Sequence, residues 1–514
     1  MFSKVKSCAV HGVDGRMIDV EADVNDGLPV FTMVGYLSSS VRESSERVRT
    51  ALKNLGFHLP PKRITINLSP ADMRKDGSGY DLAIATAVLL SLGVTAELPM
   101  EQTLVLGELS LDGSIKAIPG VLPMVICARE EGMTSCIVPK ENVQEAALVQ
   151  GISVIGVSSL KETMEYIQGI KEYENTNVEQ PAVDTSEYLY DIDFSDVVGQ
   201  ESIKRGMEIA AAGFHNVLLT GAAGAGKSML AKRLPTILPQ MSFEESLEVT
   251  KIYSVGGMLP PEGGLIHRRP FRAPHHTISE YALIGGGRVP TPGEVSFAHY
   301  GVLFLDELPE FSKPVLEVLR QPLEDRRIRI SRVQASYEFP ADFMFVAAMN
   351  PCPCGNYPDY RRCSCTEQQI RRYQSKVSGP LLDRIDIRME VKGVKQEVLF
   401  SKQKTESSKT IRARVEQARQ MQKERFAGTG LLFNSQLDGK NLEEYITLSE
   451  EGKRLVLQLF EEQELSVRGV HRVLKLARTI ADLAGSEEIE HAHLQEAAFY
   501  RNQDVFAKEV LYGN

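Results

Sequence analysis

A run of glycine and alanine that ends in lysine and serine interrupts the middle of the chain: Gly221, Ala222, Ala223, Gly224, Ala225, Gly226, Lys227 and Ser228. It matches G-x-x-x-x-G-K-[ST] and stands between the apolar stretch Val217–Thr220 and a helical run that begins at Met229. Glycines in this context let backbone N–H groups turn toward phosphates, and the following helix adds a favourable dipole. Lys227 would supply charge to the β- and γ-phosphates, and Ser228 a hydroxyl to Mg²⁺. A small-residue turn with an incidental lysine is the alternative. The run therefore predicts ATP and Mg²⁺ as bound species.

Two adjacent carboxylates, Asp306 and Glu307, follow about eighty residues later. They come directly after the apolar stretch Val302–Leu305, which predicts a buried strand that delivers both carboxylates to the ligand edge of a sheet. We expect Asp306 to hold Mg²⁺ through its water shell and Glu307 to orient the attacking water. A strand ending in Asp-Glu is common on its own, so the prediction of ATP hydrolysis depends on its pairing with the glycine-rich run.

These residues need a sheet that brings the ends of several strands together. Val217–Thr220, Val302–Leu305 and Phe343–Ala348 are short and apolar throughout, which is typical of parallel strands covered on both faces. Helical patterns between them predict a doubly wound P-loop core. Beyond this core the chain turns helical, with Ser466 placed to cap a helix that Gly485 ends. The predicted divisions are an α/β domain (1–170), a linker (171–192), the P-loop core (193–390) and a C-terminal helical lid domain (391–514).

The bulk composition restricts the class of protein. The 514 residues are 43% hydrophobic and 25% charged, as in a globular chain with several cores. The first residues lack the pattern of a secretory signal. The longest apolar stretch, Leu82–Ala96, is shorter than the ~20 residues that span a bilayer and predicts a buried helix. We therefore expect a cytoplasmic protein with reduced thiols and no membrane partner.

The segment Ser378–Asp386 and the strand that ends at Asn350 resemble, together with the two motifs above, the AAA+ ATPases and specifically their magnesium chelatase-like branch. The resemblance implies that Asn350 senses the γ-phosphate and that Arg384 acts across a subunit boundary on the neighbour's nucleotide. A fixed guanidinium there would neutralise charge on the transferred phosphoryl group. From the residues alone, an ion pair of Arg384 with Asp383 or Asp386 is equally open.

A helical segment near the C-terminus, Ser466–Lys475, is similar to the part of this family that supplies a sensing arginine from the lid. Arg468, Arg472 and Lys475 are expected to share the polar face opposite an apolar stripe. We favour Arg468 as the sensor, with Arg472 as the alternative. A solvated basic face is the remaining interpretation.

The resemblance extends over essentially the whole chain to the ComM/YifB group, whose N-terminal domain is similar to the proteolytic domain of Lon. It is carried by Gly27–Gly35, Ser69–Asp81, Gly107–Gly113 and Ile137–Asn142. A Lon-type peptidase needs a serine nucleophile and a lysine base. Gly79 stands where the serine should be, with Ser78 one position early, and Val121-Leu122-Pro123 stand where the lysine should follow. We therefore expect a peptidase-inactive domain that serves as an assembly or binding platform.

An insertion made of Arg269–Ser279 and Ile284–Arg288 lies between the two nucleotide motifs, roughly where the magnesium chelatase-like branch carries one. The alternation over 326–339 predicts a hairpin, which the resemblance places at the pore of a ring. Arg329 and Arg332 from several copies would bind DNA phosphates there, although the chain has a net charge of −10. A basic cluster of this kind can instead be a solvated face.

Four of the seven cysteines fall within fourteen residues, at Cys352, Cys354, Cys363 and Cys365. Four thiolates suit a closed tetrahedral Zn²⁺ site, although C-x-C-x₈-C-x-C is not the usual pair of C-x₂-C motifs. Unligated thiols on a loop are the alternative. His275 and His276 are interpreted as packed or hydrogen-bonded side chains rather than as ligands.

The sequence as a whole predicts a Mg²⁺-ATP-dependent motor that assembles into a ring, expected to be a hexamer, and translocates on DNA. The resemblance to the ComM/YifB group implies branch migration of recombination intermediates during natural transformation. Two other functions stay open. One is a motor subunit of magnesium chelatase for tetrapyrrole metal insertion, and the other is a scaffold that switches partners with nucleotide.

Overall fold

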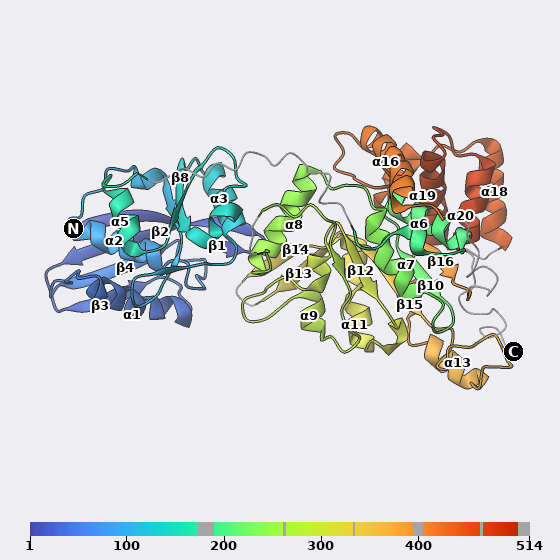
Figure 1. Ribbon diagram of the computed structural model, residues 1–514, viewed down its shortest axis with the longest axis horizontal. Helices are drawn as coiled ribbons and strands as arrows, with labels where there is room; N and C mark the ends of the chain where they lie inside the picture. The colour runs from blue at the N-terminus through green and yellow to red at the C-terminus, as the bar shows by residue number, and fades with distance from the viewer. Residues whose placement is uncertain (173–189, 261–263, 333–334, 394–404, 463–465, 502–514) are drawn as a thin grey trace.

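Three regions follow one another in the computed structural model, which describes residues 1–172, 190–260, 264–332, 335–393, 405–462 and 466–501. They are an N-terminal α/β region, a central α/β region and a C-terminal group of helices (Figure 1). Most of the predicted linker (173–189) lies outside the described residues, as do 394–404, 463–465 and 502–514 of the predicted lid. The expected α/β organisation with several regions is confirmed.

A mixed seven-stranded sheet, in the order β3-β4-β2-β1-β5-β8-β9, forms the N-terminal region. Alternation along β2 buries Ile18, Val20 and Ala22 on one face, as expected for a strand over a core. The strands are β1 (Phe2–His11), β2 (Asp14–Asn25), β3 (Val30–Val34), β4 (Arg63–Ser69), β5 (Thr103–Val105), β8 (Ser135–Pro139) and β9 (Ser153–Val157), with a separate pair β6 (Glu108–Leu109) and β7 (Ile115–Lys116). The helices are α1 (Ser39–Asn54), α2 (Asp81–Ser91), α3 (Val121–Glu130), α4 (Val143–Ala146) and α5 (Leu160–Ile167).

The long apolar stretch of this region forms α2, as predicted. Ten of its residues are buried, including Leu82, Ile84 and Val88, because it packs between the sheet and α1. Within the residues that the structure describes, no helix combines the length and the apolar character needed to cross a bilayer.

The central sheet is parallel throughout, in the order β11-β12-β15-β10-β16. Its strands are β10 (Val217–Thr220), β11 (Phe271–Arg272), β12 (Val302–Leu305), β15 (Met344–Met349) and β16 (Ile387–Glu390). The three strands that are placed next to one another, β12, β15 and β10, are fully buried. Since all run in one direction, the segments that follow them meet at one edge of the sheet. The parallel core predicted from the three apolar runs is confirmed, with β15 starting one residue later than expected.

Helices and one hairpin surround this sheet (Figure 1). The helices are α6 (Glu201–Gly213), α7 (Lys227–Arg233), α8 (Phe243–Val255), α9 (Glu280–Ile284), α10 (Glu294–Phe297), α11 (Lys313–Val318), α12 (Arg320–Asp325), α13 (Glu367–Gln374) and α14 (Gly379–Leu382). The predicted hairpin is present as β13 (Arg327–Ser331) and β14 (Ser336–Pro340).

The hairpin lies against the N-terminal region. His11 stacks on Tyr337 with ring centroids 4.5 Å apart. Gly12, at φ +68°, comes so close to β14 that a Cβ atom there would stand 2.8 Å from the backbone oxygen of Glu338. The turn between β1 and β2 therefore rests directly on the hairpin.

The C-terminal helices are α16 (Ser408–Arg425), α17 (Gly439–Tyr445), α18 (Glu450–Glu462), α19 (Val467–Leu483) and α20 (His491–Arg501). Ser466 caps α19 by accepting a hydrogen bond from the backbone N–H of Gly469, and Gly485 follows its end at φ +69°, as the sequence predicts. Both α16 and α19 pack against α6 of the central region.

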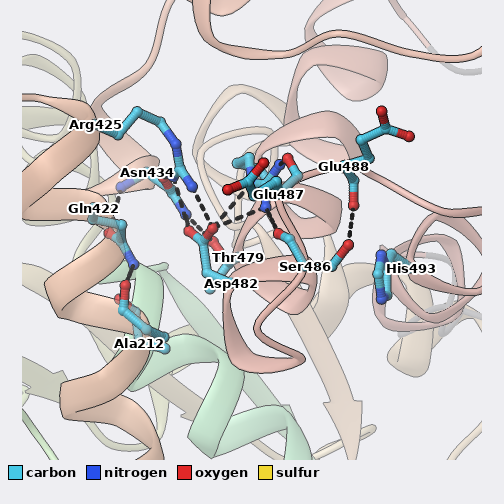
Figure 2. Close-up of polar contacts among 12 residues, drawn as sticks. Ala212, Gln422, Arg425, Asn434, Thr479, Asp482, Ser486, Glu487, Glu488 and His493 are labelled. Atoms are coloured by element: carbon cyan, nitrogen blue, oxygen red, sulfur yellow. Dashed lines mark hydrogen bonds and ion pairs between the residues drawn. The ribbon is translucent and has the colours of Figure 1, made fainter.

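A buried polar network ties these helices together (Figure 2). The fully buried Asp482 carboxylate accepts hydrogen bonds from Arg425, Arg478 and Asn434, at 2.5 to 3.1 Å. Gln422 reaches from α16 to the backbone oxygen of Ala212 in α6, at 2.9 Å. The network thus joins α16 and α19 to the central region.

Replacing Asp482 by alanine is expected to destabilise the folded chain by about 3–5 kcal/mol, because it leaves the guanidinium groups of Arg425 and Arg478 buried without their carboxylate. The shift in the urea midpoint, followed by circular dichroism, measures the effect. Glu487→Ala is the matched control, since Glu487 contributes only its backbone oxygen to Arg478. Equal midpoints for the two variants would contradict the role assigned to the network.

Candidate nucleotide site at the edge of the central sheet

The glycine-rich run forms a loop between β10 and α7, with Lys227 as the first residue of the helix. Lys227 Nζ donates to the backbone oxygens of Gly221 (2.7 Å) and Ala222 (2.9 Å) and to Asn350 Oδ1 (3.0 Å). Burial lowers the pKa of Lys227, and the charges of Asp306 and Glu307 act in the opposite direction. The loop therefore places one ammonium group where the backbone turns around it, as phosphate binding requires.

Oxygen ligands for a divalent cation meet beside this lysine. Ser228 Oγ donates to Asp306 Oδ2 at 2.5 Å, which brings the hydroxyl of α7 and the carboxylate that follows β12 to one point. Mg²⁺ prefers such oxygen ligands and is usually held by one or two of them together with phosphates and water. The side chains present fit Mg²⁺ bound with a nucleotide.

Glu307 follows Asp306 with its backbone in the left-handed region, at φ +52°. Its N–H donates to Asp306 Oδ1 at 2.9 Å, and its side chain is 59% exposed. His276 Nδ1 of the insertion lies 3.8 Å from Glu307 Oε2. Glu307 is thus directed to solvent at the rim of the site, where a water molecule can reach it.

Asn350 follows the last residue of β15, which pairs with β10 on one side and β12 on the other. The sheet therefore brings Lys227, Asp306 and Asn350 together from three separate parts of the chain. Asn350 was placed here by sequence reasoning, and its hydrogen bond to Lys227 puts it at the phosphate end of the loop.

Arg384 lies at the opposite edge of the sheet. It precedes β16, whose first residue Ile387 pairs with Val217 at the start of β10, and its backbone oxygen accepts a hydrogen bond from Asn216 at 2.9 Å. The glycine-rich loop begins at Gly221, four residues after Val217 and about 13 Å further along at ~3.3 Å per residue. The backbone of Arg384 therefore lies at the opposite end of β10 from the nucleotide loop of its own chain.

The acidic partner of Arg384 differs from both alternatives that the sequence left open. Its guanidinium pairs with Glu324 of α12 and donates to the backbone oxygen of Pro380. Asp383 and Asp386 lie close in sequence, but Asp386 is turned inward to other partners. Local spacing cannot indicate Glu324, because it stands sixty positions earlier in the chain.

Arg468, the favoured lid residue, is 70% exposed and lies 3.9 Å from the same Glu324. Arg472 instead pairs with buried Asp386 at 2.9 Å. Although burial alone would raise the pKa of Asp386, the hydrogen bond from His215 and the charges of Arg472 and Lys475 hold it well below its usual range. Arg472 is thus held as a structural cation.

The alternative interpretation of Arg468, Arg472 and Lys475 as a solvated basic face does not fit two of the three residues, Arg472 and Lys475. Lys475 donates to the backbone oxygen of Ser435 at 3.1 Å, and burial lowers its pKa to about 8. Arg472 is only 17% exposed. Both side chains are covered by neighbouring segments, because α19 packs against α6 of the central region and against the short turn that carries Ser435.

Ser78 and Lys75 of the N-terminal region each form a hydrogen bond with a different partner. Ser78 Oγ donates to the Glu108 carboxylate, and Lys75 Nζ donates to the backbone oxygen of Pro70. Burial lowers the pKa of Lys75. Neither hydrogen bond pairs the serine with a lysine base, which is what a Lon-type peptidase needs.

The hairpin arginines keep their side chains at the surface. Arg327 and Arg329 share Glu338 of the opposite strand, at 2.8 and 2.9 Å, and Arg332 donates to the backbone oxygen of Gly287 at 3.2 Å. A cavity of about 570 Å³ beside the contact of the hairpin with the N-terminal region is lined by residues of both, including Arg16, Arg74, Arg288 and Arg332. The hairpin therefore carries more positive than negative charge.

The four cysteines after β15 meet in space, with all Sγ atoms within 4.8 Å of one another. Backbone N–H groups of Asn356 and Ser364 hold the pKa of the Cys354 thiol at about 6. This cluster could hold a metal ion. His275 and His276 do not belong to it, since they stack on each other and contact Thr277 and Glu307.

Comparison with known proteins agrees with the resemblance. Sequence models of the magnesium chelatase family match three segments: residues 193–399 (magnesium chelatase, subunit ChlI), 405–501 (magnesium chelatase, subunit ChlI C-terminal) and 20–142 (subunit ChlI of Mg-chelatase).

Two relatives match over nearly the whole of both chains, and a third matches over a shorter segment. The competence protein ComM of Haemophilus influenzae is 40% identical over 503 residues, 97% of each chain, and the uncharacterized protein YifB of Escherichia coli is 40% identical over 506 residues, 98% of this chain and 97% of that one. Lon protease 2 of Bacillus subtilis is 30% identical over 183 residues, or 32% of each chain. The chain therefore belongs to the magnesium chelatase-like AAA+ family that includes ComM and YifB.

Proposed function

We propose that the protein is an ATP-hydrolysing AAA+ motor that forms a ring, with six subunits as the expected number, and moves on DNA to drive branch migration. One observation carries the ring: the residues for phosphate, metal and water lie at one edge of the sheet, and Arg384 lies at the other. A neighbouring subunit that docks its Arg384 edge on this site completes it.

The residues of the site have separate roles in this proposal. Lys227 and the backbone amides of its loop bind the phosphates, while Ser228 and Asp306 hold Mg²⁺. Glu307 orients a water molecule and accepts its proton. Asn350 contacts the γ-phosphate and so distinguishes ATP from ADP.

The opposite edge would supply the transition-state charge. Arg384 and Arg468 both lie at Glu324, so the two guanidinium groups belong to one surface. On docking, that surface presents two cations to the phosphates of the adjacent subunit. Glu324 keeps them oriented until the neighbour's nucleotide competes for them.

DNA binding is assigned to the hairpin β13–β14. Arg327 and Arg329 share the single carboxylate of Glu338, and the Arg332 side chain donates to a backbone oxygen, so a ring of hairpins would present a basic circle to the phosphate backbone. The competence-related name of the relative ComM is consistent with a DNA substrate.

Alanine at both Arg329 and Arg332 is expected to abolish the stimulation of ATP hydrolysis by DNA. It should also reduce the slope of log affinity against log salt by about one unit for each DNA phosphate that the hairpin no longer neutralises. Hydrolysis rates with and without branched DNA, and filter binding at several salt concentrations, measure both effects. Arg42→Ala with Arg49→Ala, on the exposed face of α1, is the matched control.

Full stimulation by DNA in the hairpin variant would contradict the assignment. The motor itself is tested by unwinding of a three-stranded or four-way junction, with Lys227→Ala as the inactive reference. A chelatase subunit would respond to chelatase partners and not to DNA, and a nucleotide switch would bind ATP without turnover. The N-terminal region does not separate these functions, because its own family match carries the chelatase name.

A further inference from the structure

Four thiols stand directly beside the nucleotide loop. The Sγ atoms of Cys352 and Cys354 are 3.4 Å apart, those of Cys352 and Cys363 3.8 Å, and those of Cys354 and Cys363 3.6 Å. A disulfide would bring two sulfurs to ~2.05 Å. These three cysteines and Cys365, the fourth of the cluster, are all free thiols. A tetrahedron with Zn–S distances of ~2.3 Å separates its sulfurs by about 3.8 Å. The cluster therefore has the spacing of one tetrahedral Zn²⁺ site.

Polar groups around the cluster favour thiolates. The backbone N–H of Tyr357 donates to Cys352 Sγ at 3.4 Å, and Asn356 Nδ2 lies 3.9 Å from Cys354 Sγ. Cys352 is fully buried and the other three cysteines are half-buried. N–H groups aimed at ligand sulfurs are the outer contacts that orient and stabilise a metal–thiolate site.

The turn within this cluster touches the nucleotide loop. Gly355 has φ +80°, and its N–H closes the turn on the backbone oxygen of Cys352 at 3.0 Å. A Cβ atom on Gly355 would stand 3.4 Å from the backbone nitrogen of Ala223 and 3.8 Å from Cγ of Asn350. The turn at Gly355 thus lies next to both the loop and the candidate γ-phosphate sensor, close enough that a side chain at this position would contact them.

A residue of α13 also holds the segment that follows Asn350. Gln374, near the end of α13, donates to the backbone oxygen of Pro351 at 2.9 Å. Between Asn350 and α13, the four cysteines bring the two ends of the segment 352–365 together, and backbone hydrogen bonds of Asp359 with Asn356 and Cys363 close the turn between them. Without a metal, the four neighbouring thiols would form only weak hydrogen bonds with one another, and these would not fix the turn at Gly355 beside Ala223.

We propose that one Zn²⁺ bound by Cys352, Cys354, Cys363 and Cys365 braces the nucleotide loop, so that metal occupancy sets the affinity for ATP. The proposal rests on the assignment of the glycine-rich loop as the ATP site. The zinc folds residues 352–365 into a knuckle that fixes the chain directly after Asn350 and keeps the turn at Gly355 beside Ala223. It takes no part in the chemical step.

Metal analysis of the purified full chain should give about one zinc per chain and no stoichiometric iron. Cys365→Ser, which alters the ligand furthest in sequence from Asn350, should lose the zinc. It should also weaken binding of a fluorescent ATP analogue about tenfold, the effect of misplacing one hydrogen bond to a charged phosphate. Cys127→Ser, in α3 of the N-terminal region, is the matched control and should change neither quantity.

Two further measurements distinguish the binding of zinc from its effect on nucleotide affinity. Gly355→Asn tolerates a positive φ and keeps all four thiols, but its side chain meets the loop, so it should retain zinc and still bind the analogue more weakly. If Cys365→Ser fails to fold, stripping wild-type protein with a chelator and adding zinc back should lower and then restore affinity.

Absence of zinc, or stoichiometric iron in its place, would overturn the site. Unchanged nucleotide affinity after zinc loss would overturn the brace. Both readouts are independent of DNA and of hydrolysis. A chain that binds zinc and ATP without moving on DNA would refute the proposed motor and leave this inference intact.

Discussion

Glutamine in place of Glu307 is expected to lower kcat for ATP hydrolysis by about 10²- to 10⁴-fold, the usual contribution of a positioned general base. The amide keeps the size of the side chain but cannot accept a proton. ATP affinity should change little, since the phosphates are assigned to Lys227 and its loop and the metal to Ser228 and Asp306. Steady-state phosphate release and equilibrium binding of an ATP analogue measure the two quantities separately.

Glu310→Gln provides the control for charge and position. Glu310 lies three residues later, and its carboxylate pairs with Lys376 at 3.5 Å, away from Asp306. Its replacement should leave kcat within the scatter of wild-type preparations. A Glu307→Gln protein that turns over ATP at the wild-type rate would remove Glu307 from the chemistry. His276, 3.8 Å away, would then be the next residue to test.

The sequence predicts the part of the site that is formed by short motifs of neighbouring residues. Asp306 and Asn350 directly follow short apolar runs, and Lys227 and Ser228 follow a third run across the glycine-rich loop. A parallel sheet brings the segments after such runs together whatever the connections are. For this reason the parallel sheet, and the cluster of Lys227, Asp306 and Asn350, could be predicted from short sequence motifs.

The partners of the arginines were not predictable in this way. Glu324 and Asp386 are chosen by how α12, α14 and α19 pack, and nothing in the spacing near Arg384 or Arg472 points to them. Periodicity indicates which residues share a face of α19, but not what covers that face. His276 was missed as a neighbour of Glu307 for the same reason, since a long insertion carries it there.

Alanine in place of Arg384 is expected to lower hydrolysis by about 10³- to 10⁵-fold, as loss of an arginine finger does. Its ATP affinity should be nearly normal, because the backbone of the residue lies at the opposite end of β10 from the loop of its own chain. Arg49→Ala, an exposed arginine of α1 paired with Glu46, controls for loss of positive charge. Phosphate release by each homogeneous preparation gives the first comparison.

Mixing variants decides whether Arg384 acts on a neighbour. In a ring that combines Arg384→Ala and Glu307→Gln chains, an Arg384→Ala subunit keeps its own Glu307 and receives Arg384 from the adjacent Glu307→Gln subunit. Random assembly at equal amounts makes about one quarter of the interfaces competent, so activity should rise far above either parent. Lys227→Ala mixed with Glu307→Gln must stay inactive, because both changes damage the same side of the interface. If the first mixture were as inactive as the second, Arg384 would not act between subunits, and the sheet geometry would require a cation from elsewhere.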